Sequence, residues 1–104
     1  MAGGHVYVSG TAPVMPDGAP PPADAYGQTR RCLEIIVDAL AQAGARAEDV
    51  VRTRIYVTSA DSFEDVARAH SEIFRDVRPA NTTVVAQLLD PRWKVEIEAE
   101  AVLP

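Results

Sequence analysis

The strictest pattern in the chain is an alternation of apolar residues and glutamates near its C-terminus. Carboxylates stand at every second position, at Glu96, Glu98 and Glu100. The intervening positions are all apolar: Val95, Ile97, Ala99 and Ala101. Because a β-strand sends successive side chains to opposite faces, this segment predicts a strand with one apolar and one acidic face. Such a strand requires a sheet that is covered on one face and polar on the other.

Three further segments have strand-like composition. One run occupies residues 78–89, and a short turn containing Asp90 and Pro91 separates it from the acidic strand. Shorter runs lie at residues 5–10 and 50–58. In the last of these, the more apolar face is predicted to carry Val51, Thr53, Ile55 and Val57, and the other face Arg52, Arg54 and Tyr56. Four strands are therefore expected.

Two helices are predicted between these strands, and a proline-rich loop at residues 11–22. The first begins near Asp24, and Gly44 is placed to end it in a left-handed conformation. The second begins near Asp61 and Ser62, which are natural N-caps, and ends before Pro79. Its apolar stripe consists of Phe63, Val66, His70, Ile73 and Phe74. This order predicts an α+β fold with two helices packed on one face of a mixed sheet. The other face would be solvated or packed against copies of the chain.

Size and composition restrict the class of protein. The 104 residues suit a single domain, and no apolar run is long enough to span a membrane. A net charge of −5 argues against nucleic acid as a partner. Cys32 has no partner for a disulfide, so a cytoplasmic location is expected. No cluster of cysteine and histidine has metal-ligand spacing, so neither a metal nor a cofactor is expected.

Several motifs, taken in order, resemble those of the Rid family, also called YjgF or L-PSP. The matching segments lie at residues 8–13, 28–36, 43–45, 49–58, 63–74, 78–80 and 95–99. This resemblance implies a chorismate-mutase-like fold and a homotrimer with clefts between its subunits. The best-studied members of the family hydrolyse reactive enamines and imines, such as 2-aminoacrylate, to the keto acid and ammonia.

The resemblance also implies which residues form the site. In the family, an arginine after Pro-Ala anchors the substrate carboxylate, and a glutamate in the Val-Glu-Ile-Glu motif handles water. The glutamate corresponds to Glu96, but the arginine position holds Asn81. A neutral amide cannot replace a bidentate guanidinium, so Arg54 or Arg92 would have to serve as anchor if the substrate carries a carboxylate. Ser9 and Thr83 are further candidates for contact with the ligand. The chain also opens only four residues before His5, where family members carry a longer segment.

The residues leave several alternatives open. Glu96 is either catalytic or a strand glutamate that is solvated or paired with Arg52 or Arg54. Glu98 and Glu100 are expected to be structural or solvated. His70 is expected to be a packed histidine with a hydrogen bond, and Cys32 a small packed side chain. The chain could be a hydrolase of small imines with altered specificity, or a trimer that binds a metabolite without turnover. A ribonuclease is disfavoured by the acidic charge and by the absence of a paired-histidine pattern.

Overall fold

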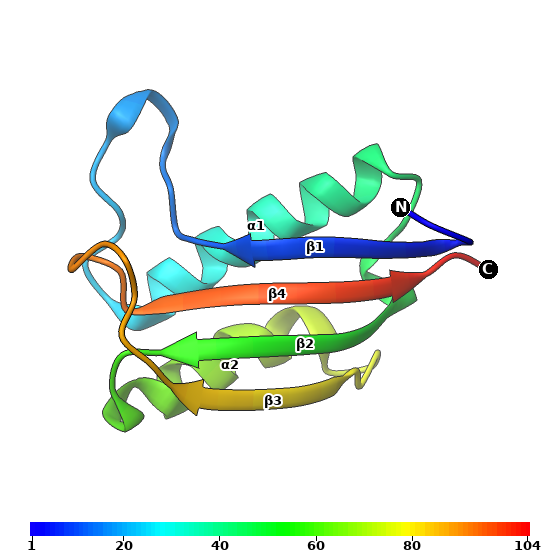
Figure 1. Ribbon diagram of the computed structural model, residues 1–104. Coiled ribbons are helices and arrows are strands. Elements are labelled where there is room, and N and C mark those ends of the chain that lie inside the picture. Colours follow the sequence, from blue (N-terminus) through cyan, green and yellow to red (C-terminus); the bar gives the residue numbers. More distant parts are fainter.

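The computed structural model describes residues 1–104 as one mixed sheet of four strands (Figure 1). The strands are β1 (His5–Thr11), β2 (Val50–Val57), β3 (Ala80–Val85) and β4 (Val95–Val102). Their order across the sheet is β1-β4-β2-β3. β4 is antiparallel to both β1 and β2, whereas β3 runs parallel to β2 at the edge. The predicted mixed sheet is confirmed.

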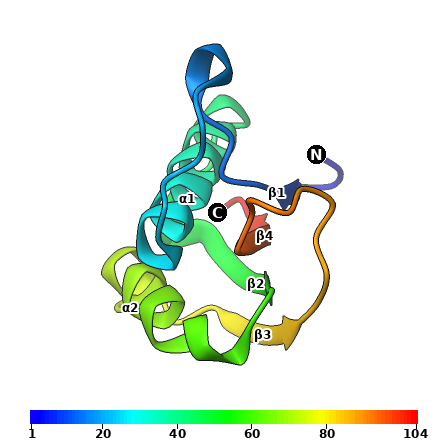
Figure 2. The same ribbon diagram turned by 90° about the vertical axis from the view of Figure 1, so that its left-hand side faces the viewer.

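Both helices cover the same face of this sheet (Figure 2). Helix α1 spans Ala25–Gln42 and helix α2 spans Phe63–Phe74. α1 begins where the sequence predicts, and the carboxylate of Asp24 caps it by accepting a hydrogen bond from the backbone N–H of Gly27. At the other end Gly44 takes a φ of 83°, in the left-handed region that a residue with a side chain avoids. No helix in the chain has the length and apolar character needed to cross a membrane.

The core lies between the helices and the inward face of the sheet. Its buried apolar residues are Val6, Ala25, Cys32, Leu33, Ile36, Leu40, Ala45, Val50, Ile55, Val57, Val66, Phe74, Val95, Ile97, Ala99 and Ala101. β4 alternates as predicted, with its apolar residues buried and its glutamates outside. β2 differs from its predicted pattern, because Val50 is buried and Val51 is 46% exposed. An irregularity in the pairing with β4 between Val50 and Arg52 causes this shift.

Two other expectations are wrong. On α2, Phe63 is 50% exposed and Ile73 also lies at the surface, so the buried stripe of that helix is narrower than predicted. The two C-terminal strands are not joined by a short turn, because β2 lies between them in the sheet. Residues 86–94 instead cross that strand, and the buried amide of Gln28 holds this connection. Its nitrogen donates to the carbonyls of Pro22 and Arg92, and its oxygen accepts from the N–H of Lys94.

Candidate functional site

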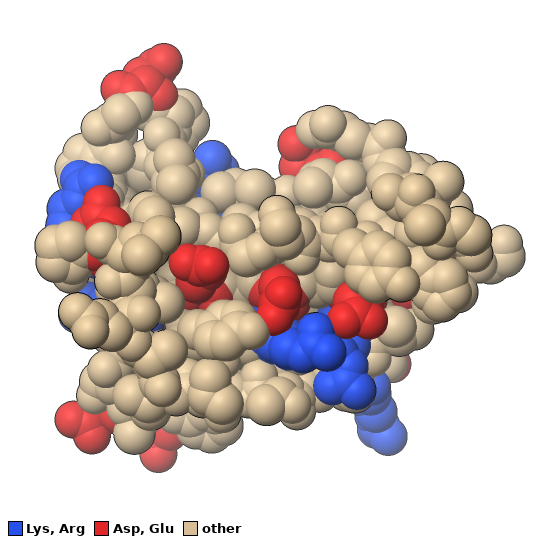
Figure 3. Space-filling model, in the orientation of Figure 1, with Lys and Arg blue, Asp and Glu red and all other residues tan.

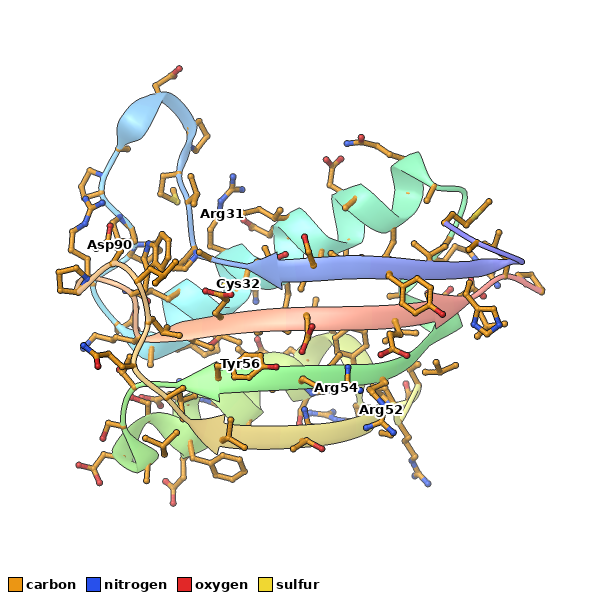
Figure 4. All side chains as sticks on the ribbon, in the orientation of Figure 1. Arg31, Cys32, Arg52, Arg54, Tyr56 and Asp90 are labelled. Atoms are coloured by element: carbon orange, nitrogen blue, oxygen red, sulfur yellow. The ribbon has the colours of Figure 1, made fainter.

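The face of the sheet turned away from the helices carries a row of charged side chains (Figure 3). Arg54 on β2 donates to Glu100 at 2.9 Å and lies 3.9 Å from Glu98. The hydroxyl of Tyr56 donates to the same oxygen of Glu98. The hydrogen bond to Glu100 raises the pKa of the Arg54 guanidinium, and the hydrogen bond to Glu98 raises the pKa of Tyr56. Figure 4 shows Arg54 and Tyr56 on this open face of β2. Glu98 and Glu100 are thus structural, as predicted.

Glu96 differs from the other two carboxylates because it has no hydrogen-bond or ion-pair partner within the chain. It lies beside an irregularity in β1, where the pairing shifts between Val8 and Thr11. A Cβ atom at Gly10 would overlap the carboxylate of Glu96, so the absence of a side chain at Gly10 makes room for it. Ser9 is exposed in the same segment. The structure therefore brings Glu96 and the Ser9–Gly10 segment together, with an acceptor that no partner occupies.

Cys32 lies in the core behind Glu96 and is not exposed. Burial, with a smaller contribution from the charge of Glu96, raises the pKa of its thiol to about 12. A thiol with so high a pKa is protonated at neutral pH and is a poor nucleophile. The sequence interpretation of Cys32 as a small packed side chain is confirmed.

Asn81 and Thr83 lie on the inward-facing side of the sheet, at its β3 edge. Asn81 is in register with Thr53, whose side chain is completely buried toward the helices. The Asn81 amide nitrogen is 3.0 Å from the Thr53 hydroxyl oxygen and 3.4 Å from the Thr53 carbonyl oxygen. The Thr83 hydroxyl donates to the Asn81 amide oxygen at 3.0 Å. Asn81 itself remains exposed at the edge, so a ligand can reach it.

The same network extends to His70 on α2, whose Nε2 is 2.9 Å from the Thr53 hydroxyl oxygen. The His70 ring also packs against Phe74, at 4.8 Å between ring centroids. Burial lowers the pKa of His70, which favours the neutral imidazole. His70 is a packed histidine with a hydrogen bond, as predicted, although its partner lies on β2.

Protonation of His70 should make stability depend on pH. The folded state lowers the pKa of His70 below the unfolded value of about 6.5, so the unfolded chain binds more protons between the two values. The free energy of unfolding is therefore expected to decrease as the pH falls from 7.5 through this window. Urea denaturation at fixed protein concentration between pH 7.5 and 5 measures the slope. The carboxyls with lowered pKa, Asp49, Glu72 and Asp90, affect stability only below this range.

His70→Gln should remove the slope while retaining a side chain that can bond to Thr53. His5→Gln reports how much of the slope comes from the other histidine. An undiminished slope in His70→Gln would show that another group is responsible.

The structure does not bring all the predicted site residues together within one chain. Glu96 and Ser9 belong to the open side of the sheet, whereas Asn81 and Thr83 belong to the helix side of its β3 edge. The surface has three hollows, and residues of the connection between β3 and β4 line the largest, of about 580 Å³. None of the three is lined by Glu96, Ser9, Asn81 or Thr83.

Neither proposed substitute for the missing arginine is free to act as an anchor. Arg54 is bound to Glu100. Arg92 forms a two-point ion pair with Asp90, at 3.1 Å and 2.8 Å, and this pair lowers the pKa of Asp90. Both guanidinium groups are thus already neutralised by carboxylates of the same chain.

Comparison with known proteins gives consistent results. Residues 1–103 match the family described as Endoribonuclease L-PSP. An uncharacterized protein of Streptomyces coelicolor is 38% identical over 101 residues, which cover 96% of this chain and 75% of that protein. A member of the YjgF/YER057c/UK114 family from Mycobacterium tuberculosis is 39% identical, with a TM-score of 0.89 over 99% of this chain and 82% of that one. E. coli TdcF with bound serine is 28% identical, with a TM-score of 0.91 over 100% of this chain and 84% of that one.

Proposed function

Since this chain belongs to the Endoribonuclease L-PSP family, also known as Rid or YjgF, we propose that it binds a small metabolite in a cleft between two of its copies. Within that cleft it would hydrolyse a reactive enamine or imine. The likeness to E. coli TdcF, whose structure contains bound serine, supports a ligand of amino-acid size. Ribonuclease activity is disfavoured, because the net charge of −5 would repel a phosphate backbone.

The observation that carries this proposal is the separation of Glu96 from Asn81 by the sheet itself. A small ligand cannot touch both faces of one sheet, so a site that uses both residues requires a second copy of the chain. Glu96 of one copy would then face the β3 edge of its neighbour. Such head-to-tail contacts can close into a ring, and the resemblance to the family implies a ring of three.

Exposed apolar side chains around β3 support a covered surface there. Val84 and Val85 on β3 are exposed, and Leu89 in the following connection is 96% exposed. Val85 and Leu89 line the same hollow, whereas Val84 is in register with Tyr56 on the open face. Exposed apolar surface on both sides of this edge is typical of a surface that another chain covers. On the open face, Arg54 is already paired with Glu98 and Glu100, so a neighbouring copy would bury these three charges in compensated form.

The chemistry follows from the free carboxylate. Glu96 would accept a proton from a water molecule while the water oxygen bonds to the imine carbon. Transfer of that proton to the imine nitrogen would give a carbinolamine. Its hydroxyl proton would then pass to the nitrogen as the C–N bond breaks and the C=O bond forms, which releases ammonia and a carbonyl compound. Ser9 would contact the ligand beside Glu96, and Asn81 and Thr83 would contact it from the neighbouring copy.

A trimer that binds a metabolite without turnover is the second candidate. One observation favours it: Asn81 stands where the family's carboxylate anchor is expected, and Arg54 and Arg92 are both paired with carboxylates of the same chain. The two candidates differ in turnover, which a rate measurement separates.

The proposal predicts that the chain accelerates hydrolysis of imines that lack a carboxylate, with weak or no activity on 2-aminoacrylate-type imines. A flavin amine oxidase and an amino-acid oxidase can generate the two classes in place. Semicarbazide then traps whatever the chain has not hydrolysed, and the yield of semicarbazone is measured. Native mass spectrometry should show an assembly of three 11.2 kDa chains in the same samples.

Acceleration of neither imine by a folded trimer would contradict the enzymatic proposal and favour the binding protein. Strong protection of the 2-aminoacrylate-type imine would show that another cation replaces the missing arginine.

A further inference from the structure

We infer that the β3 edge, at Asn81 and Thr83, binds a hydrogen-bond donor of the ligand, a primary amide or an ammonium group, and rejects a carboxylate. This inference rests on the proposed function for the presence of the ligand in the cleft. At this end of the cleft, the hydrogen bonds within the chain decide whether donors or acceptors remain available to a ligand.

The donors of Asn81 are already committed within the chain. A side-chain amide has two N–H donors and one oxygen with two lone pairs. The nitrogen of Asn81 faces two acceptors of Thr53, its hydroxyl oxygen at 3.0 Å and its carbonyl oxygen at 3.4 Å. No donor of this amide is left to meet a carboxylate.

The carbonyl of Thr53 also determines which way the amide is turned. A backbone carbonyl oxygen can only accept, so the amide atom that faces it has to be the nitrogen. The amide oxygen of Asn81 is thereby placed toward Thr83, whose hydroxyl donates to it at 3.0 Å. A flipped amide would set its oxygen against the Thr53 carbonyl oxygen and would lose the bond to that carbonyl.

Thr83 also presents a hydrogen-bond acceptor to a ligand. Its hydroxyl has a single proton, which goes to Asn81 and leaves the oxygen lone pairs available. One lone pair of the Asn81 amide oxygen is also free. The side chains at this edge therefore offer two oxygen acceptors to a ligand and no donor.

His70 supports the direction of these bonds. Burial lowers the pKa of His70 and so favours the neutral imidazole, whose Nδ1–H tautomer can accept the proton of the Thr53 hydroxyl at Nε2, 2.9 Å from the hydroxyl oxygen. The Thr53 oxygen is then free to accept from Asn81. With His70 in this tautomer, the hydrogen bonds run in one direction: Thr83 donates to Asn81, Asn81 to Thr53, and Thr53 to His70.

This edge therefore accepts hydrogen bonds from a ligand, whereas an arginine at the same position would donate them. A guanidinium presents only donors and binds a carboxylate through two parallel hydrogen bonds. The two oxygens of Asn81 and Thr83 would repel a carboxylate and would instead accept N–H groups.

The test compares serine with serinamide, which differ only in the carboxylate and the primary amide. Titration of the ¹⁵N-labelled chain, followed by NMR at a pH where both amino groups are protonated, gives the two dissociation constants. We expect serinamide to bind more tightly by on the order of tenfold, with shifts of the Asn81 side-chain amide. Asn81→Arg should reverse the preference, because it restores a group that presents only donors.

A matched pair of variants on β3 isolates the role of Thr83. Thr83→Val removes one acceptor and should weaken serinamide binding, whereas Thr82→Val, in register with Arg54 on the other side of the sheet, should not. Tighter binding of serine by the unmodified chain would overturn this inference and leave the shared cleft intact. Binding of neither compound, by the chain or by Asn81→Arg, would overturn the proposed function as well.

Discussion

Glu96→Gln is expected to reduce imine hydrolysis by about 10²–10⁴-fold, the usual contribution of a general base. Glutamine has nearly the same shape as glutamate but cannot take a proton from water. Glu96 has no partner within the chain, so the substitution breaks no hydrogen bond or ion pair and should leave stability almost unchanged. The rate is measured by the semicarbazide competition, and the fold by thermal melting of the same preparation.

Glu98→Gln is the matched control, two residues further along the same face of β4. Glu98 accepts a hydrogen bond from Tyr56, and a glutamine oxygen can accept the same bond. The control should retain its activity. An equal loss in both variants would show that the charge of the whole face matters, and unchanged activity in Glu96→Gln would remove Glu96 from the chemistry.

Much of the fold could be predicted from periodicity alone. The alternation in β4 identified its buried and exposed faces correctly, because a strand has only two faces. The start of α1 near Asp24 was visible from the change of period, and its end at Gly44 because a left-handed helix end favours glycine. Periodicity failed at Val51, since one irregular residue moves the alternation to the other face.

The site was less predictable because it depends on the order of the strands. Glu96 and Asn81 could be selected from their places in the family's motifs, and both remain candidates. Nothing local to either residue indicates that β3 lies parallel to β2, which puts Asn81 in register with Thr53. The contact of Thr53 with His70 likewise joins residues from two elements, and neither carries a sequence signal for the other. Gly10 was visible only as the end of a strand, although it makes room for Glu96.

Combining two inactive variants in one assembly is expected to restore part of the activity. Glu96→Gln lacks the base, and the double variant Asn81→Ala with Thr83→Val lacks the acceptors at the β3 edge. If each cleft takes Glu96 from one copy and Asn81 from its neighbour, mixed assemblies contain some intact clefts. For random mixing of equal amounts around a head-to-tail ring, about a quarter of the clefts are intact.

Activity of such mixed assemblies is the most direct measurement of whether the site is shared between copies. The two variants are co-expressed with different tags, assemblies that carry both tags are purified, and their hydrolysis of the carboxylate-free imine is measured. Each variant alone should be almost inactive, and the purified mixed assemblies should recover about a third of the unmodified rate, because a head-to-tail ring of three that contains both variants has one intact cleft. A mixture no more active than the two separate variants, with both tags present in one assembly, would contradict a site built from two copies.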